Sequence, residues 1–228
     1  MVVSAREEAS KIGLEILMKG GNAFDAAVAV HFALAVCYPQ AGNIGGGGFM
    51  LARTASDENI ALDFREKAPA AASRDMYLDL NGNVIPDLST LGHLAIGVPG
   101  SVDGMETIHK KYGTLPWKDL IMPAVELAEK GFILTELDVI ELNQYVSDFE
   151  KLNPYNQYLR STKPYSVGDT IIQTHLGITL RKIANDGKKG FYDGPIASMI
   201  LKEIKRGGGI ISFEDLQNYQ SVWRTPLV

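Results

Sequence analysis

The chain has 228 residues, of which 46% are hydrophobic and 21% are charged. This composition excludes a disordered chain and predicts a globular protein with a substantial core. The formal net charge of -5 disfavours a nucleic-acid partner, because phosphate binding draws on clustered lysine and arginine. No apolar run approaches the roughly 20 residues of a membrane span, and we find no signal peptide ahead of the first predicted helix.

Residues 1–228 are predicted to form a single domain, because no stretch rich in proline, serine or glycine separates two parts. The single cysteine, Cys37, excludes an internal disulfide. It ends an apolar run, so we expect it to be buried and unreactive.

The first third of the sequence predicts two helices and a hairpin. Ser4 and Glu7 match a capping box, and the glycines at 20–21 end the helix that begins there. Asn22 and Asp25 begin a second helix, whose stretch AFDAAVAVHFALAV is apolar almost all round and therefore belongs in the interior. Two apolar runs, FMLAR and IALDFR, flank the polar segment TASDEN, which is typical of a β-hairpin.

The remainder is predicted to be mostly helical. Periodicity and glycine-rich stops indicate helices over 101–112, 117–130, 135–149, 173–185 and 194–206. Ser212 and Asp215 cap one more short helix. The order of helix, helix, hairpin and then many helices favours an α+β or layered sandwich fold over a βαβ winding.

The stretch GNIGGGGFML, residues 42–51, places four glycines between the second helix and the hairpin. A dinucleotide-binding loop follows a strand and opens a helix, and a Walker loop is followed by Lys-Ser or Lys-Thr, so neither fits here. Two compatible interpretations remain. The glycines permit a sharp turn at a crowded strand start, or their bare N–H groups line a substrate cavity.

Other catalytic patterns are weak. The four histidines lack the spacing of zinc ligands, and no Gly-x-Ser-x-Gly elbow occurs, so we expect no metal site and no cofactor. Thr174 and His175 stand at the start of a predicted helix. We predict that Thr174 is a cap or surface residue and not a nucleophile.

The stretch DFREKAP is the most informative. Asp63, Arg65 and Glu66 cluster where a predicted strand ends, close to the glycine loop across the hairpin. One hypothesis is a surface ion pair, which contributes little to stability. The other makes the planar Arg65 guanidinium a two-pronged clamp on a substrate carboxylate, with the two acids holding it in position. The residues by themselves leave both hypotheses open.

Several long motifs in order give the chain a specific resemblance. They are GGNAFDAAVAVHFALAVCYPQAGNIGGGGFML, DFREKAP, HLAIGVPGSVDG, KYGTLPW, ELAEKGF, GFYDGPIA and GGIISFEDLQNY. With these motifs the chain resembles the γ-glutamyltranspeptidase family, also called glutathione hydrolases. The resemblance implies an N-terminal-nucleophile hydrolase, a four-layer α/β/β/α sandwich made as a precursor that cuts itself into a large and a small subunit. This chain then corresponds to most of the large subunit.

The resemblance also implies a reaction and a substrate contact. A threonine at the start of the small subunit attacks the γ-glutamyl amide of glutathione or a similar compound, and water or an acceptor amine resolves the ester. Arg65 binds the α-carboxylate of the donor, and the glycine loop packs beneath the hairpin that presents it. Family members usually work in the periplasm or at the cell surface, so the resemblance implies a periplasmic or extracellular location.

One departure limits what the chain can do. The family's nucleophile opens a Thr-Thr-His motif, which we expect beyond Val228, so the chain itself holds no catalytic residue. Without the small subunit, strand edges and apolar faces should be exposed and favour self-association. Two alternatives stay open: a cephalosporin acylase of the same fold, which retention of Arg65 disfavours, and a non-catalytic binding protein that keeps the carboxylate clamp.

Purified residues 1–228 should release no aniline from a γ-glutamyl anilide, because the nucleophile is absent from them. The processed full-length protein, assayed in the same colorimetric experiment, is the positive control. Detectable turnover by residues 1–228 alone would refute the prediction.

Overall fold

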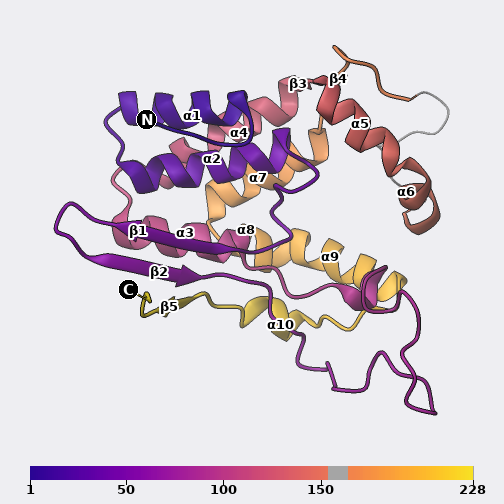
Figure 1. The fold of residues 1–228 in the computed structure, drawn as a ribbon. Helices are drawn as coiled ribbons and strands as arrows, with labels where there is room; N and C mark the ends of the chain where they lie inside the picture. Colours follow the sequence, from indigo (N-terminus) through magenta and orange to yellow (C-terminus); the bar gives the residue numbers. More distant parts are fainter. Residues whose placement is uncertain (154–163, 228) are drawn as a thin grey trace.

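The computed structural model describes residues 1–153 and 164–227, and within them the chain is an α+β protein. Helix α1 (Glu7–Met18) and helix α2 (Ala23–Cys37) pack on one another (Figure 1). The capping box predicted for α2 is confirmed: the Asn22 side chain accepts from the N–H groups of Phe24 and Asp25, and Asp25 accepts from the Asn22 N–H.

The capping box predicted for α1 is wrong. The helix begins at Glu7 with Arg6 as its N-cap, and no side chain caps it. The Ser4 hydroxyl donates instead to the Arg6 carbonyl at 2.8 Å. The buried Arg6 guanidinium is paired with Asp138 and Glu8, so a tertiary ion pair fixes this end of the helix. The predicted end is correct, because Gly20 adopts the left-handed conformation with φ of 89°.

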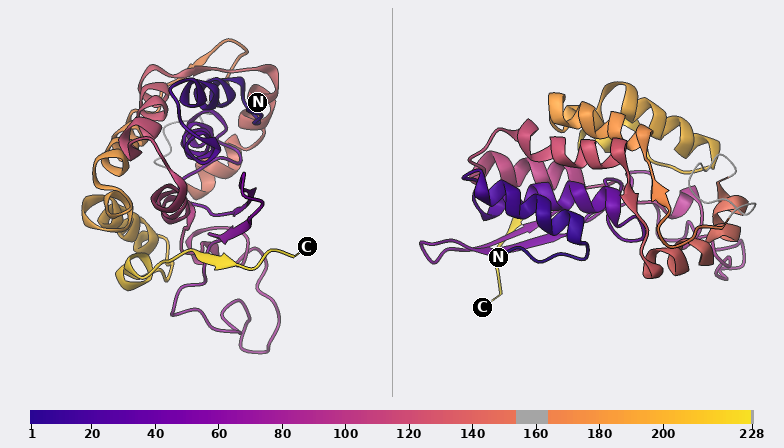
Figure 2. Two further views of the ribbon diagram at one scale, coloured as in Figure 1. Left: turned by 90° about the vertical axis from the view of Figure 1, so that its left-hand side faces the viewer. Right: turned by 90° about the horizontal axis from the view of Figure 1, so that it is seen from above.

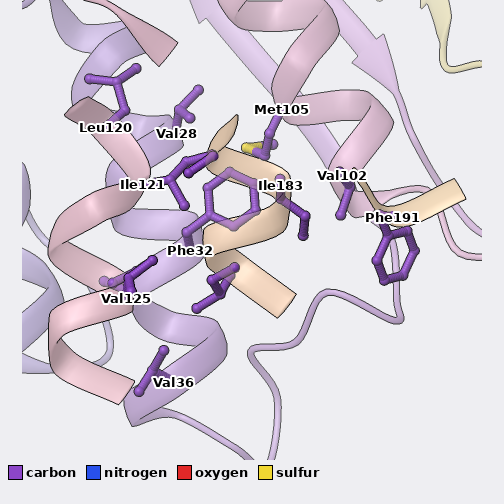
Figure 3. Close-up of a cluster of buried hydrophobic side chains, with 14 of the residues drawn as sticks. Val28, Phe32, Val36, Val102, Met105, Leu120, Ile121, Val125, Ile183 and Phe191 are labelled. Atoms are coloured by element: carbon purple, nitrogen blue, oxygen red, sulfur yellow. The ribbon is translucent and has the colours of Figure 1, made fainter. Parts of the chain in front are cut away.

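Helix α2 is the centre of the core. It packs against α4 (Trp117–Lys130) and α3 (Ser101–Tyr112), and α4 in turn packs against α7 (Thr174–Asp186). Figure 3 shows Phe32 of α2 surrounded by side chains of these helices, among them Ile121 and Ile183. Phe32 is fully buried, and the Trp117 ring lies edge-on to it with 5.7 Å between centroids. The prediction that α2 lies in the interior is therefore confirmed.

The remaining elements surround this core. They are the 3-10 helix η1 (His93–Ala95), α5 (Glu136–Gln144), α6 (Val146–Leu152), α8 (Lys189–Tyr192), α9 (Gly194–Arg206), α10 (Phe213–Gln217), and the pair β3 (Phe132–Ile133) and β4 (Thr170–Ile171). One helix predicted over 135–149 is two, α5 and α6, because Tyr145 leaves the helical conformation with φ of -99° and ψ of 7°. Apolar periodicity does not register a break of one residue. The Ser212 cap of α10 is confirmed.

An antiparallel sheet in the order β1-β2-β5 carries the predicted hairpin, β1 (Phe49–Arg53) and β2 (Asn59–Asp63). The third strand, β5 (Val222–Arg224), pairs with β2 and was not predicted. Helices α1, α2 and α3 lie on one side of this sheet (Figure 1 and Figure 2).

The two faces of the sheet differ in exposure. Ile60 and Leu62 point inward and are buried, whereas Phe49, Leu51 and Val222 share the outer face and are exposed. Within the described part of the chain, no helix combines the length and apolar character needed to cross a bilayer.

One histidine sits in an apolar part of the fold. The His31 ring lies edge-on to Phe32 and Phe64, with centroid distances of 5.8 and 6.3 Å. Its Nε2 atom is buried and has no hydrogen-bond partner among the described residues. Burial lowers the pKa of His31 from 6.5 to about 4, because the charged form is poorly solvated there.

The free energy of unfolding should therefore fall as the pH is lowered from 6.5 to about 4, since only the unfolded state binds this proton in that window. The loss is expected to be about 2 to 3 kcal/mol. His31→Leu should remove this part of the acid destabilisation, and urea unfolding at neutral and at acid pH measures it. Equal acid losses in the two proteins would contradict the assignment.

Candidate substrate-binding site

Arg65 lies just past the end of β2 and over the outer face of the sheet. Phe64, the residue before it, is buried, whereas the Arg65 side chain is 59% exposed. The guanidinium carbon lies 6.0 Å from the centroid of the Phe49 ring, which belongs to the exposed outer face. The Arg65 Nε is 3.3 Å from Glu66 Oε2.

The two neighbouring acids have different roles. We expected both to hold the guanidinium, and Glu66 does contact it. Asp63 binds elsewhere: its Oδ1 accepts from the Arg65 backbone N–H at 3.0 Å, and its Oδ2 accepts from Arg224 Nη2 at 2.8 Å. The hydrogen bond from the Arg65 N–H, followed by the one from Arg224, lowers the pKa of Asp63. Asp63 therefore fixes the backbone of Arg65 and ties it to β5.

The glycine loop packs directly on the backbone around Arg65. A Cβ atom on Gly47 would lie 2.5 Å from the Phe64 carbonyl oxygen and 2.8 Å from the Glu66 nitrogen. Gly48 and Phe64 exchange two backbone hydrogen bonds, and the Gly46 carbonyl accepts from Gly100 at 2.7 Å. The close-packing interpretation of the glycines is therefore confirmed, and the loop also joins this segment to the start of α3.

A separate cavity adjoins the same loop. Its volume is about 850 Å³, and Gly45 and Ile44 line it together with side chains of α9 and the segment before α3. Arg65 is not among its lining residues. The lining is mostly apolar, with His93 and Glu203 as its ionisable members, so the cavity is distinct from the site at Arg65.

Two residues of this site escaped prediction from the sequence. The Tyr219 hydroxyl donates to the Arg65 carbonyl at 2.6 Å, and Arg224 pairs with Asp63. Both come from more than 150 residues further along the chain, so no local pattern connects them to Arg65. Tyr219 does close the motif GGIISFEDLQNY, which is the signal that could have pointed to it.

The other candidates lie outside this site. Cys37 is fully buried, and burial raises its pKa to about 12, so it is unreactive as predicted. Thr174 is the first residue of α7 and is exposed, while Gln173 occupies the N-cap, so Thr174 is a surface residue and not a cap. Across residues 1–153 and 164–227, no group of three or more His, Cys, Asp or Glu side chains is placed to hold a metal.

The structural neighbours place the fold in the class of N-terminal-nucleophile hydrolases. The γ-glutamyltranspeptidase of Helicobacter pylori superposes with a TM-score of 0.97 at 48% identity, over 100% of this chain and 66% of that one. The cephalosporin acylase of Bacillus halodurans superposes with a TM-score of 0.83 at 26% identity, over 96% of this chain and 42% of that one.

The sequence comparisons give the family. The family model of γ-glutamyltranspeptidase matches residues 9–228, and the chain belongs to that family. The glutathione hydrolase proenzyme of Pseudomonas sp. strain A14 is 51% identical over 223 residues, which are 97% of this chain and 39% of that protein. The chain therefore spans about two fifths of the length of this relative.

Two alanine substitutions in the glycine loop test whether its glycines are needed for close packing. Gly47→Ala should lower the free energy of unfolding by about 1 to 3 kcal/mol, because its Cβ meets backbone atoms that cannot move aside easily. Gly45→Ala should change it by less than about 0.5 kcal/mol, since the nearest atom to that Cβ, Asn43 Oδ1, is 3.7 Å away. Urea unfolding measures both, and equal losses would contradict the packing role.

Proposed function

We propose that this chain is the large-subunit portion of a γ-glutamyltransferase, or glutathione hydrolase, and that Arg65 binds the α-carboxylate of the γ-glutamyl donor. The observation that carries the proposal is the exposed Arg65 guanidinium, held by Glu66 at Nε over the outer face of the sheet. Among the residues that the structure describes, neither terminal Nη of Arg65 donates a hydrogen bond. Two parallel N–H groups are thus free to receive a planar carboxylate.

The proposed reaction needs a second polypeptide. A precursor cuts itself, and the threonine freed at the start of the small subunit attacks the γ-carbonyl carbon while the amine of the donor leaves. Water or an acceptor amine then resolves the γ-glutamyl ester. The name proenzyme, carried by the relative from Pseudomonas sp., supports a processed precursor. We place its action outside the cytoplasm, in the periplasm or at the cell surface.

The small subunit is the proposed partner of the outer sheet face. Phe49 and Leu51 are 66% and 77% exposed there, next to Arg65. Covering them would bury apolar area and would bring the nucleophile toward the clamped donor. The same exposed side chains favour self-association when the small subunit is absent.

The acylase alternative shares the fold but has weaker support. Identity to the cephalosporin acylase is 26%, against 51% to the glutathione hydrolase proenzyme, and Arg65 suits a donor that carries an α-carboxylate. The non-catalytic alternative is tested by the gene itself: a Thr-Thr-His segment downstream of residue 228 supports the enzyme, and its absence supports a binding protein.

Arg65→Ala in the processed full-length protein should lower kcat/KM for a γ-glutamyl anilide, because the donor carboxylate loses its partner. The fall should correspond to a loss of about 2 to 5 kcal/mol of transition-state stabilisation. Arg65→Lys should recover part of the loss, since it keeps the charge without the fork. Steady-state kinetics measures both effects.

Arg53→Ala is the matched control. Arg53 is 67% exposed, lies on the same hairpin and is paired with Asp57, away from the proposed site. It should leave kcat/KM within about twofold. A loss of less than about tenfold for Arg65→Ala, with both subunits present on a gel, would show that Arg65 is not the clamp.

A further inference from the structure

The backbone of Arg65 is held at both of its polar groups. Its N–H donates to Asp63 Oδ1 at 3.0 Å, and its carbonyl accepts from the Tyr219 hydroxyl at 2.6 Å. The first contact comes from two residues away, whereas the second crosses from the far end of the described chain. Tyr219 therefore determines where the Arg65 peptide lies relative to the helical layer.

Tyr219 is itself rigidly placed. Its side chain is only 3% exposed, and its ring is stacked on Tyr192 with centroids 6.0 Å apart and planes 3° from parallel. Lys67 Nζ lies 5.0 Å from the Tyr219 ring centroid and donates to the Gln220 carbonyl at 2.7 Å. Because packing on both the ring and the following residue restricts this buried side chain, the position of its hydroxyl is fixed.

The segment that follows Tyr219 is anchored on α3. Both the N–H and the hydroxyl of Ser221 donate to Asp103 Oδ2 at 2.7 Å. Asp103 is 2% exposed and is also paired with Lys188 at 2.5 Å. This buried, charged contact ties the residues just after Tyr219 to α3.

Gly100 makes room for the Tyr219 hydroxyl. A Cβ atom at this position would lie 2.1 Å from the hydroxyl oxygen and 2.1 Å from the Phe64 carbonyl oxygen. No side chain fits there without moving one of the two groups that border the Arg65 peptide. The glycine is thus a condition for the contact between Tyr219 and Arg65.

The hydroxyl remains a donor at neutral pH. Burial, followed by the negative charges of Asp103, Asp63 and Glu66, raises the pKa of Tyr219. The hydroxyl proton is therefore present to bind the Arg65 carbonyl.

We propose that Tyr219 is a positioning residue for substrate binding, which holds the Arg65 peptide so that its guanidinium meets the α-carboxylate of a γ-glutamyl donor. This inference rests on the proposed function of Arg65. A clamp works only when its starting point is fixed, because small displacements of a binding group weaken its alignment with the ligand. Tyr219 does not touch the substrate and acts through Arg65.

The test is Tyr219→Phe in the processed full-length protein, with a γ-glutamyl anilide as donor. KM should rise about fivefold to tenfold, the factor of one lost hydrogen bond, and kcat should stay within about twofold. Tyr77→Phe is the matched control, because it also removes a phenolic hydroxyl that donates to a backbone carbonyl, that of Leu94 at 3.2 Å, and it contacts neither Arg65 nor Tyr219. It should leave both constants within about twofold although it also removes one hydrogen bond from the fold.

Three results would overturn the inference: an unchanged KM in Tyr219→Phe, an equal rise in KM in Tyr77→Phe, or a fall in kcat with KM unchanged. Arg65→Ala, assayed in parallel, separates this inference from the proposed function. If Arg65→Ala raises KM and Tyr219→Phe does not, only the role of Tyr219 fails. If neither variant raises KM, the clamp itself fails.

Discussion

The candidate site depends on a close approach of backbones around residues 64–66. Gly47 on one side and Gly100 on the other come so near the Phe64 carbonyl that a side chain at either position would overlap it. Bare backbone on both sides brings the hairpin, the glycine loop and the start of α3 into one rigid unit. The Arg65 side chain is exposed, but the backbone that carries it is held in place by this unit, which is unusual for a surface arginine.

Much of the fold follows from local patterns. The apolar helix around Phe32 predicted the centre of the core, the Asn22 cap predicted its start, and alternating runs around TASDEN predicted the hairpin. These succeed because each pattern is set by the residues that form the element. They fail where a distant residue intervenes, as at the start of α1, where the partner of Arg6 is Asp138. Strand β5 was missed because its three residues carry no period to detect and are extended by pairing with β2.

The site was predictable only in part, for the same reason. The cluster DFRE and the neighbouring glycines indicated a segment that the structure does bring together, and the resemblance implied a carboxylate ligand for Arg65, which stays a prediction. The sequence did not reveal that the two acids have different partners, because Arg224, which pairs with Asp63, lies 161 residues further along the chain, whereas Glu66 contacts Arg65 itself. Tyr219 reaches the site only through the tertiary fold.

The span between Arg65 and Tyr219 has a consequence for how the chain is made. Helices α1 and α2 can associate as soon as they leave the ribosome, since they are neighbours in sequence. The Arg65 peptide acquires its second hydrogen bond only after 154 further residues have been synthesised. During that interval the nascent hairpin lacks its third strand, and a cell that produces this protein must keep the growing edge from pairing with other chains.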